Sequence, residues 1–234
     1  MNDASFLSRI HRYLRAARGH HIDTPHDNEI DSRKTNKEYP RMPKISLSTG
    51  ELVMSLGDAI RKRRSSREMT LHASPTKKKI GVLFHHALKE QEDGRRPYPS
   101  GGALYPIETY LIARGIADIP DGIHHYHPRA HALEYLWPVS RNKSLFVPGA
   151  AWADSASTII ILTALWKRNY KKYNNFGYLL GVLEAGHIGQ NIFLVATALN
   201  LSSCPVAGFN DEEVTKILNL EREIEQPVLA IVIN

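Results

Sequence analysis

A mostly apolar stretch in the second half of the chain, residues 178–199, reads YLLGVLEAGHIGQNIFLVATAL. Four polar residues lie in its middle, namely Glu184, His187, Gln190 and Asn191. The length would suit a membrane span, but polar side chains at mid-span are costly in hydrocarbon. We therefore expect no membrane segment and predict a helix that is buried in the core of the protein or in a dimer interface.

The segments around this helix show strand and helix patterns. Strands are predicted over residues 107–113, 157–164 and 228–233, with a hairpin over 124–136. Helices are predicted over residues 4–18, 74–88 and 211–220, the second with Ser74 as N-cap and Pro75 at its first position. Because helices come first and strands are interspersed later, the order predicts an α+β fold with one central antiparallel or mixed sheet flanked by helices.

The first 49 residues differ in character from the rest. After the predicted helix, residues 20–47 have no hydrophobic period and include several prolines, which is typical of an extended arm. We therefore divide the chain into an N-terminal helix and arm, residues 1–49, and one domain, residues 50–234. Four arginines interrupt the apolar residues of the first helix. That pattern does not match a secretion signal, so we expect a cytoplasmic protein.

Composition excludes some classes of protein. The 234 residues are 42% hydrophobic and 23% charged, which excludes wholesale disorder. Cys204 is the single cysteine, so an intramolecular disulfide and a cysteine-based zinc site are excluded as well. The net charge of +6 is uneven, because residues 1–96 carry +8 and residues 97–234 carry −2. A basic surface of this kind suits nucleic acid, a peptide or a phosphorylated small molecule.

Basic residues are densest in Arg63-Arg64-Ser65-Ser66-Arg67, at the end of a short helix that opens at Ser55. One interpretation is a solvated helix end, where the helix dipole favours cations. The other is a phosphate clamp, because guanidinium groups present donors in a fixed geometry to an anion. No aromatic residues interleave with these arginines and no recognisable nucleic-acid-binding module is present. We therefore expect no nucleic-acid partner.

Two further segments carry groups suited to a ligand. Residues 98–106, YPSGGALYP, are either a turn before a strand or a site where glycine lets the backbone and the Ser100 hydroxyl approach a flat ligand. Lys171-Lys172-Tyr173 is either a surface lysine pair or places one lysine in a pocket, where burial or a neighbouring cation would lower its pKa. The sequence alone leaves both pairs of alternatives open.

The histidines His124, His125, His127 and His131 raise the question of a metal site. Their run contains neither a carboxylate nor a cysteine, and histidines beside a hairpin turn suit a polar surface. Because a transition-metal site needs a defined ligand set with supporting residues, we expect no metal.

Taken in order, five motifs form a series. They are Arg-Arg-Ser-x-Arg at 63–67, Pro-Ser-Gly-Gly-Ala-Leu-Tyr-Pro-Ile-Glu at 99–108, Lys-Tyr at 172–173, Leu-Glu-Ala-Gly-His-Ile-Gly-Gln-Asn at 183–191 and Pro-Val-Ala-Gly-Phe at 205–209. The series resembles the SagB-type branch of the nitroreductase-like FMN flavoenzymes. That branch includes dehydrogenases that convert thiazolines and oxazolines to thiazoles and oxazoles in peptide natural products. The resemblance covers residues from about 50 to 234.

The resemblance implies a nitroreductase-like α+β fold in an intertwined homodimer, with FMN bound non-covalently at the subunit interface. The arginine motif would contact the phosphate, ribityl chain and ring edge, and the glycine-rich segment would reach the isoalloxazine from the partner subunit. A backbone N–H of the 206–208 turn would face flavin N5. The cofactor-binding residues implied are Arg63, Arg64, Ser65, Arg67, Pro99, Ser100, Gly101, Val206, Ala207 and Gly208. Three glutamates, Glu221, Glu223 and Glu225, stand where many relatives carry basic residues, so the first-half arginines would hold the phosphate.

The Lys-Tyr pair implies the chemistry. Lys172 resembles the base of the azoline dehydrogenases, with Tyr173 as relay or orienting group. Such an enzyme would work with a YcaO-type cyclodehydratase and a precursor peptide. The alternatives are an NAD(P)H-dependent reductase of nitroaromatics or quinones with the same fold, and a scaffold that has lost its flavin.

Overall fold

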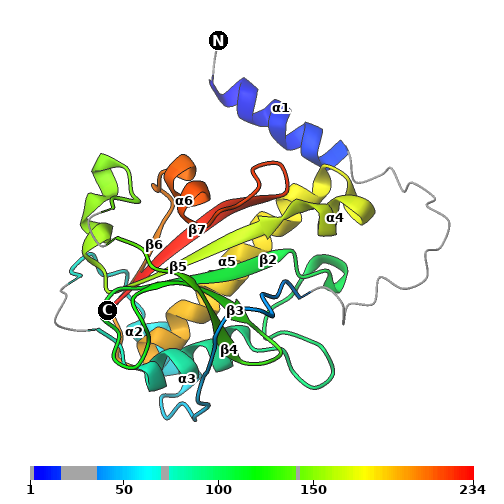
Figure 1. Cartoon of the computed structure of the whole chain (residues 1–234). Helices are drawn as coiled ribbons and strands as arrows, with labels where there is room; N and C mark the ends of the chain where they lie inside the picture. Colours follow the sequence, from blue (N-terminus) through cyan, green and yellow to red (C-terminus); the bar gives the residue numbers. More distant parts are fainter. Residues whose placement is uncertain (1–2, 17–35, 70–73, 141–142) are drawn as a thin grey trace.

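The computed structural model describes residues 3–16, 36–69, 74–140 and 143–234, and it shows an α+β fold around one central sheet (Figure 1). The strands follow the order β1-β4-β3-β2-β5-β7-β6, and all neighbouring pairs are antiparallel. Their bounds are β1 (Lys44–Ser46), β2 (Ile107–Ala113), β3 (Gly122–His127), β4 (Ala132–Trp137), β5 (Thr158–Leu165), β6 (Ser203–Val206) and β7 (Glu225–Ile233). The predicted fold class is confirmed, and the sheet is antiparallel throughout.

Helices and 3-10 turns flank this sheet. They are α1 (Asp3–Ala16), α2 (Leu56–Lys62), α3 (Lys77–Leu88), η4 (Gly101–Ala103), η5 (Pro148–Ser155), α4 (Trp166–Tyr173), α5 (Phe176–Ala198) and α6 (Asp211–Ile217). Ser55 caps α2 as expected, since its hydroxyl accepts from the Asp58 N–H at 3.1 Å. The expected cap of α3 is wrong. Thr76 caps that helix by accepting from the Lys79 N–H at 3.2 Å, so α3 begins after Ser74 and Pro75.

Two cores lie on opposite faces of the sheet because successive strand residues point to opposite sides. In β5, Ile160 and Leu162 pack in the core that includes residues of α3 and α5. Ile159 and Ile161 pack in the other core, which includes residues of η5 and α6. A strand that is covered on both faces reads as a continuous apolar run, which is why the isoleucine-rich segment predicted a buried strand.

Helix α5 crosses the length of the first core (Figure 1). Ala185, Ile188 and Ile192 face this core at helical spacing and are fully buried or nearly so. The opposite side of the helix exposes Tyr178 (52%) and Leu183 (51%). Among the helices that the structure describes, α5 is long and apolar enough to cross a membrane. Half of that apolar window is buried inside the protein.

The segment expected to be an extended arm lies partly on the domain. Residues 17–35 are outside the described residues, whereas residues 36–49 follow the edge of the sheet. There Ile45 of β1 pairs with Leu133 of β4, and the Asn36 side chain donates to Glu90 at 2.9 Å. The domain boundary at residue 50 stays a prediction, although the first strand of the sheet precedes it.

Candidate functional site

The arginine segment 63–67 runs alongside β6. The Ser66 N–H donates to the Ser203 carbonyl at 3.0 Å, and the Arg67 guanidinium lies 5.9 Å from the centroid of the Trp152 ring. Arg63 donates to the Ser65 hydroxyl at 3.4 Å. Within the described part of the chain, neither Arg63 nor Arg67 has a carboxylate partner. Among the described residues, the charges of these two guanidinium groups are therefore not paired with a carboxylate.

Arg64 has a different, local role. Its guanidinium donates to the carbonyl oxygens of Arg61 at 2.9 Å and of Arg63 at 2.8 Å. It thus satisfies carbonyl groups at the end of α2, as a basic residue at a helix C-terminus commonly does. The solvated-helix-end interpretation fits Arg64, while the clamp interpretation fits Arg63 and Arg67.

The 206–208 turn follows β6 and completes this first group of predicted residues. Val206 is buried, Ala207 is exposed, and the Gly208 carbonyl accepts from the Val147 N–H at 3.0 Å. The buried Cys204 thiol of β6 lies beside Ser65 and Arg67, although burial raises its pKa. The arginine segment and this turn therefore line the same edge of the sheet.

The glycine-rich segment forms a tight turn with an unusual backbone. Gly102, Ala103 and Tyr105 all have φ in the left-handed region, at 64°, 55° and 46°. For non-glycine residues such a conformation is strained and persists only where the surroundings hold it. The Ser100 hydroxyl helps to hold it by accepting from the Tyr105 N–H at 2.9 Å. Pro99 leads into the turn and is exposed.

Lys172 and Tyr173 lie directly over this turn. A Cβ atom added at Gly102 would come within 2.9 Å of the Lys172 Nζ and 2.7 Å of the Tyr173 Oη. The Lys172 Nζ is also 5.5 Å from the centroid of the Tyr173 ring. Glycine at 102 is thus required both by its φ and by the side chains above it. The structure places the predicted Lys-Tyr pair and the predicted glycine segment in one place.

The two groups of predicted residues occupy different ends of the molecule. Figure 1 shows α2 and β6 at one end and α4, which carries Lys172, at the other, with α5 between them. One chain therefore holds the predicted residues in two separate groups.

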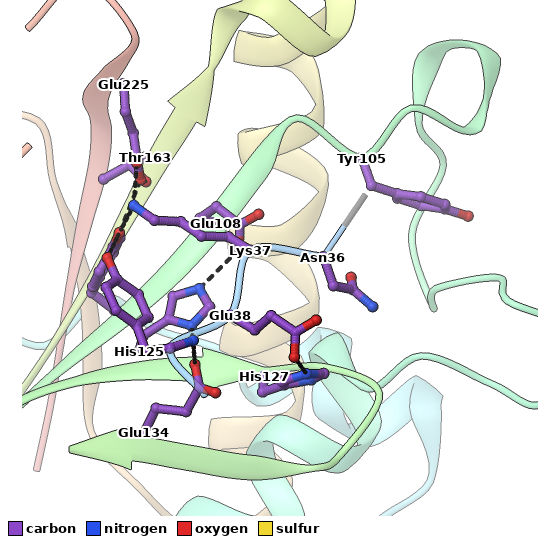
Figure 2. Close-up of polar contacts among 12 residues, drawn as sticks. Asn36, Lys37, Glu38, Tyr105, Glu108, His125, His127, Glu134, Thr163 and Glu225 are labelled. Atoms are coloured by element: carbon purple, nitrogen blue, oxygen red, sulfur yellow. Dashed lines mark hydrogen bonds and ion pairs between the residues drawn. The ribbon is translucent and has the colours of Figure 1, made fainter. Parts of the chain in front are cut away.

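A buried chain of charged groups includes Glu108, His125 and Glu134 (Figure 2), and Arg168 links it to α4. Glu108 accepts from His125 Nε2 at 3.0 Å and pairs with Arg168 at 2.6 Å, and His125 Nδ1 binds Glu134 at 2.9 Å. Burial opposes ionisation of Glu108, but Arg168 and His125 outweigh it and hold its pKa at about 2. Burial likewise opposes protonation of His125, but the two carboxylates raise its pKa above the usual value.

A neighbouring buried group surrounds Glu225. Its carboxylate binds Lys37 at 2.6 Å, Tyr110 at 3.1 Å and Thr163 at 2.5 Å (Figure 2). Burial and the nearby Glu225 raise the pKa of the Tyr110 phenol, which therefore stays neutral and donates. Glu225 thus forms an ion pair with Lys37, a lysine of the N-terminal segment.

The histidines are structural. His124, His125, His127 and His131 are all buried, which contradicts the surface interpretation. Each has a hydrogen-bond partner: the Pro120 carbonyl, the two glutamates, the Ala130 N–H and the Tyr126 hydroxyl. The carboxylates that the local sequence lacked come from neighbouring strands. In the described ranges, no group of three metal-ligating side chains is arranged to hold an ion.

Glu184 of α5 is a further buried acid beside the glycine turn. It is 2% exposed, and neither carboxyl oxygen makes a hydrogen bond of good geometry among the described residues. Burial raises its pKa to about 7, although the Ser100 hydroxyl and the Arg96 guanidinium nearby oppose that shift.

We expect the Glu184→Gln variant to be more stable, relative to wild type, at pH 8 than at pH 5. The folded pKa of Glu184 lies above the unfolded value, so its contribution to stability is present at low pH and is lost as the pH rises towards 7. The glutamine variant should therefore gain about 2 kcal/mol of unfolding free energy over wild type between these two pH values. Urea unfolding at both values measures this, with the exposed Glu221→Gln as control. Equal pH dependence in wild type and Glu184→Gln would contradict the assignment.

Three residues of this region were not predicted as functional. Glu108 and Glu184 belong to motifs of the series, but no function was predicted for either of them. Arg168 belongs to none of the motifs. The available signal for Arg168 was its position four residues before Lys172, which places both on one face of a helix.

The chain is similar to several known proteins. The sequence signature of the Nitroreductase family matches residues 60–233. MJ1384 of Methanocaldococcus jannaschii, which is named as a nitroreductase, is 29% identical over 178 residues, covering 75% of this chain and 88% of that protein. The microcin B17-processing protein McbC of Escherichia coli is 32% identical over 162 residues, covering 64% of this chain. The match spans 58% of McbC, so it covers little more than half of that relative.

A solved structure supports the fold. A chain in the structure of the E. coli microcin synthetase McbBCD complex with truncated pro-MccB17 bound superposes with a TM-score of 0.66 at 24% identity. The match covers 98% of this chain and 91% of that chain. The family signature extends over nearly the whole sheet, from α2 to the end of β7. The chain therefore belongs to the nitroreductase family.

Proposed function

We propose that the protein is an FMN-dependent dehydrogenase that oxidises thiazolines and oxazolines in a peptide to thiazoles and oxazoles. The observation that carries this proposal is the placement of Lys172 and Tyr173 over Gly102, where a strained turn and a potential base meet. Similarity to McbC, a protein that processes microcin B17, supports a peptide as the substrate.

FMN fits the donor set of the first group. The cofactor carries a phosphate dianion, and Arg63 and Arg67 offer two guanidinium groups with no carboxylate partner among the described residues. Ser65 stands between them, and the 206–208 turn lies on the adjacent strand end. We propose that these residues hold the phosphate and ribityl chain and that the turn meets the ring. Nitroreductase-family proteins are generally flavin-dependent.

The second group is proposed to reach this cofactor from a partner subunit. In one chain, the clamp and the Lys172 turn lie at different ends of the molecule (Figure 1). The exposed apolar side of α5, which includes Tyr178, Val182 and Leu183, offers the face that a homodimer would bury. Pro99, Ser100 and Gly101 would then stand beside the ring held by the other subunit.

Oxidation of an azoline removes two hydrogens from its ring. We propose that Lys172 takes one of them as a proton from a ring carbon. Tyr173 would orient the Lys172 amine, because its hydroxyl and the Lys172 Nζ both lie over Gly102. When bound, FMN supplies the acceptor for the other hydrogen with its electron pair. Because Gly102 has no side chain, the glycine turn would leave space for the substrate ring.

The proposed reaction also implies partner molecules. An azoline must first be made in the peptide, so a YcaO-type cyclodehydratase and a precursor peptide are the proposed partners. A chain of the McbBCD complex, which holds truncated pro-MccB17, shares this fold. A cytoplasmic location would suit an enzyme that modifies a newly made peptide.

An assay with an azoline-containing peptide tests the function. We expect the purified, FMN-loaded protein to lower the mass of the peptide by two hydrogens per ring, as measured by mass spectrometry. Consumption of NAD(P)H with a nitroaromatic or quinone, without any change in the peptide, would instead identify a general reductase. A colourless protein that binds no added FMN would indicate a scaffold.

A further inference from the structure

Helix α4, which carries Lys172, has one large apolar anchor, Trp166, which packs against the first core and lies beside the Tyr178 ring. The rest of the helix is mostly polar. Its sequence, WKRNYKKY, contains four charged residues, and no side chain caps its N-terminus. A polar surface helix of this kind depends on a few specific anchors. Asn169 is one of them, since it is buried and donates to the Gly177 carbonyl at 3.0 Å. Arg168 is another.

Arg168 joins α4 to the glycine turn and to the buried charges at once. Its guanidinium donates to the Tyr105 carbonyl at 2.7 Å and pairs with Glu108 at 2.6 Å. The side chain is 15% exposed, and that of Glu108 is 1% exposed. Because Arg168 and Lys172 are four residues apart on one helix, the contact at Tyr105 and the Lys172 position over Gly102 belong to the same helix face.

The contact with Tyr105 falls where the turn is strained. Tyr105 and Ala103 have left-handed φ values that only outside contacts can maintain. The Tyr105 N–H is held by Ser100 at 2.9 Å, and its carbonyl is held by Arg168 at 2.7 Å. Loss of Arg168 would remove the hydrogen bond that holds the Tyr105 carbonyl.

Glu108 is itself fixed from behind. His125 donates to it at 3.0 Å and binds Glu134 at 2.9 Å, and Glu134 accepts from the Tyr39 N–H at 3.1 Å (Figure 2). This chain of contacts runs through β2, β3 and β4 to the segment before β1. These contacts fix the position of the Glu108 carboxylate, which therefore gives Arg168 a rigid partner.

We propose that Arg168, seated on Glu108, is a positioning residue that holds the 101–105 turn and Lys172 in their mutual arrangement. The inference rests on the proposed function for the role of Lys172, but the arrangement itself is a property of this chain. Arg168 contacts neither of the reacting groups and acts through the turn and the helix.

Three variants separate positioning from simple stability. Arg168→Met removes the guanidinium, Glu108→Gln removes its carboxylate, and the double variant removes the charge pair together. Arg168→Met leaves Glu108 with only His125 of its two partners, and Glu108→Gln leaves Arg168 without a carboxylate, so both variants should unfold at lower urea concentration than wild type. The double variant should recover much of that loss, yet it still lacks the donor to Tyr105. Lys167→Met, at an exposed position of the same helix, is the matched control.

We expect kcat to fall about 10-fold or more in Arg168→Met and in the double variant, while KM changes less than about 2-fold. Hydrogen exchange of the Tyr105 amide should be about 10-fold faster in both, and unchanged in Lys167→Met. Recovery of kcat together with stability in the double variant would overturn the proposal, as would unchanged exchange at Tyr105.

The exchange measurement needs neither substrate nor flavin. If wild type fails to oxidise azolines, the proposed function fails, while exchange at Tyr105 still decides whether Arg168 holds the turn. Faster exchange then supports the positioning role alone, and unchanged exchange overturns it.

Discussion

Lys172→Ala is expected to lower azoline turnover by about 10²- to 10⁴-fold while FMN stays bound. The amine lies over the glycine turn beside Tyr173, in the place where a base would meet the substrate ring. Alanine removes the only group of that side chain that can accept a proton. Mass spectrometry of the peptide measures turnover, and the flavin absorbance of the purified variant measures cofactor content.

Lys171→Ala is the matched control for this variant. Lys171 is exposed, adjacent in sequence and in the same helix, but it does not contact Gly102 in the structure. We expect it to keep turnover within about 2-fold of wild type, as for a surface substitution. Wild-type turnover in Lys172→Ala would contradict the assignment of Lys172 as the base.

The double variant Arg63→Ala/Arg67→Ala is expected to bind FMN roughly 100-fold more weakly or worse. A charge-assisted hydrogen bond contributes about 1.5 to 3 kcal/mol, and solvent exposure of the two guanidinium groups reduces their joint effect to about 3 kcal/mol. Fluorescence quenching of added FMN measures the affinity. The fold should persist, because neither side chain has a carboxylate partner in the described ranges.

Arg64→Ala tests whether Arg63 and Arg67 bind the phosphate specifically or whether the general positive charge of the segment binds it. Its guanidinium is occupied with the carbonyl oxygens of Arg61 and Arg63, so we expect FMN affinity to change less than about 3-fold. An equal loss of affinity in Arg64→Ala would show that general positive charge, and not the two clamp residues, binds the phosphate.

Strong periodic patterns made much of the fold predictable. The isoleucine-rich strand, the hairpin around residue 128 and the long helix over residues 178–199 each follow from an apolar pattern, and the structure has all three. The cap of α3 was missed because Ser74 and Thr76 are both good caps, and only the packed helix decides between them. Strand β1 was missed because three residues carry too little pattern.

The buried charges show why part of the site could not be predicted. His125 lies opposite Glu134 in the hairpin register, so this pair could be predicted once the position of the turn was known. Glu108 reaches His125 from another strand, 17 residues away, and no local pattern reports such a contact. Arg168 lies in a short helix with four charged residues, and neither this helix nor its anchor was predicted. Tertiary contacts alone bring these groups together.

The separation of the site into two groups is likewise a property of the folded chain. The motif series placed Arg63, Gly101 and Lys172 in one functional set, but only the structure shows that α2 and α4 lie at different ends of α5 (Figure 1). In the proposed homodimer, a cofactor shared between two subunits would join the two groups.

A heterodimer that combines one Arg63→Ala/Arg67→Ala subunit with one Lys172→Ala subunit tests the central claim most directly. The two chains can be co-expressed with different affinity tags and purified through both. One of its two sites would then contain an intact clamp from one subunit and an intact Lys172 from the other. We predict that this heterodimer oxidises an azoline peptide at about half the wild-type rate per dimer, although each parental homodimer is nearly inactive. A heterodimer as inactive as its parents would contradict a site shared between subunits.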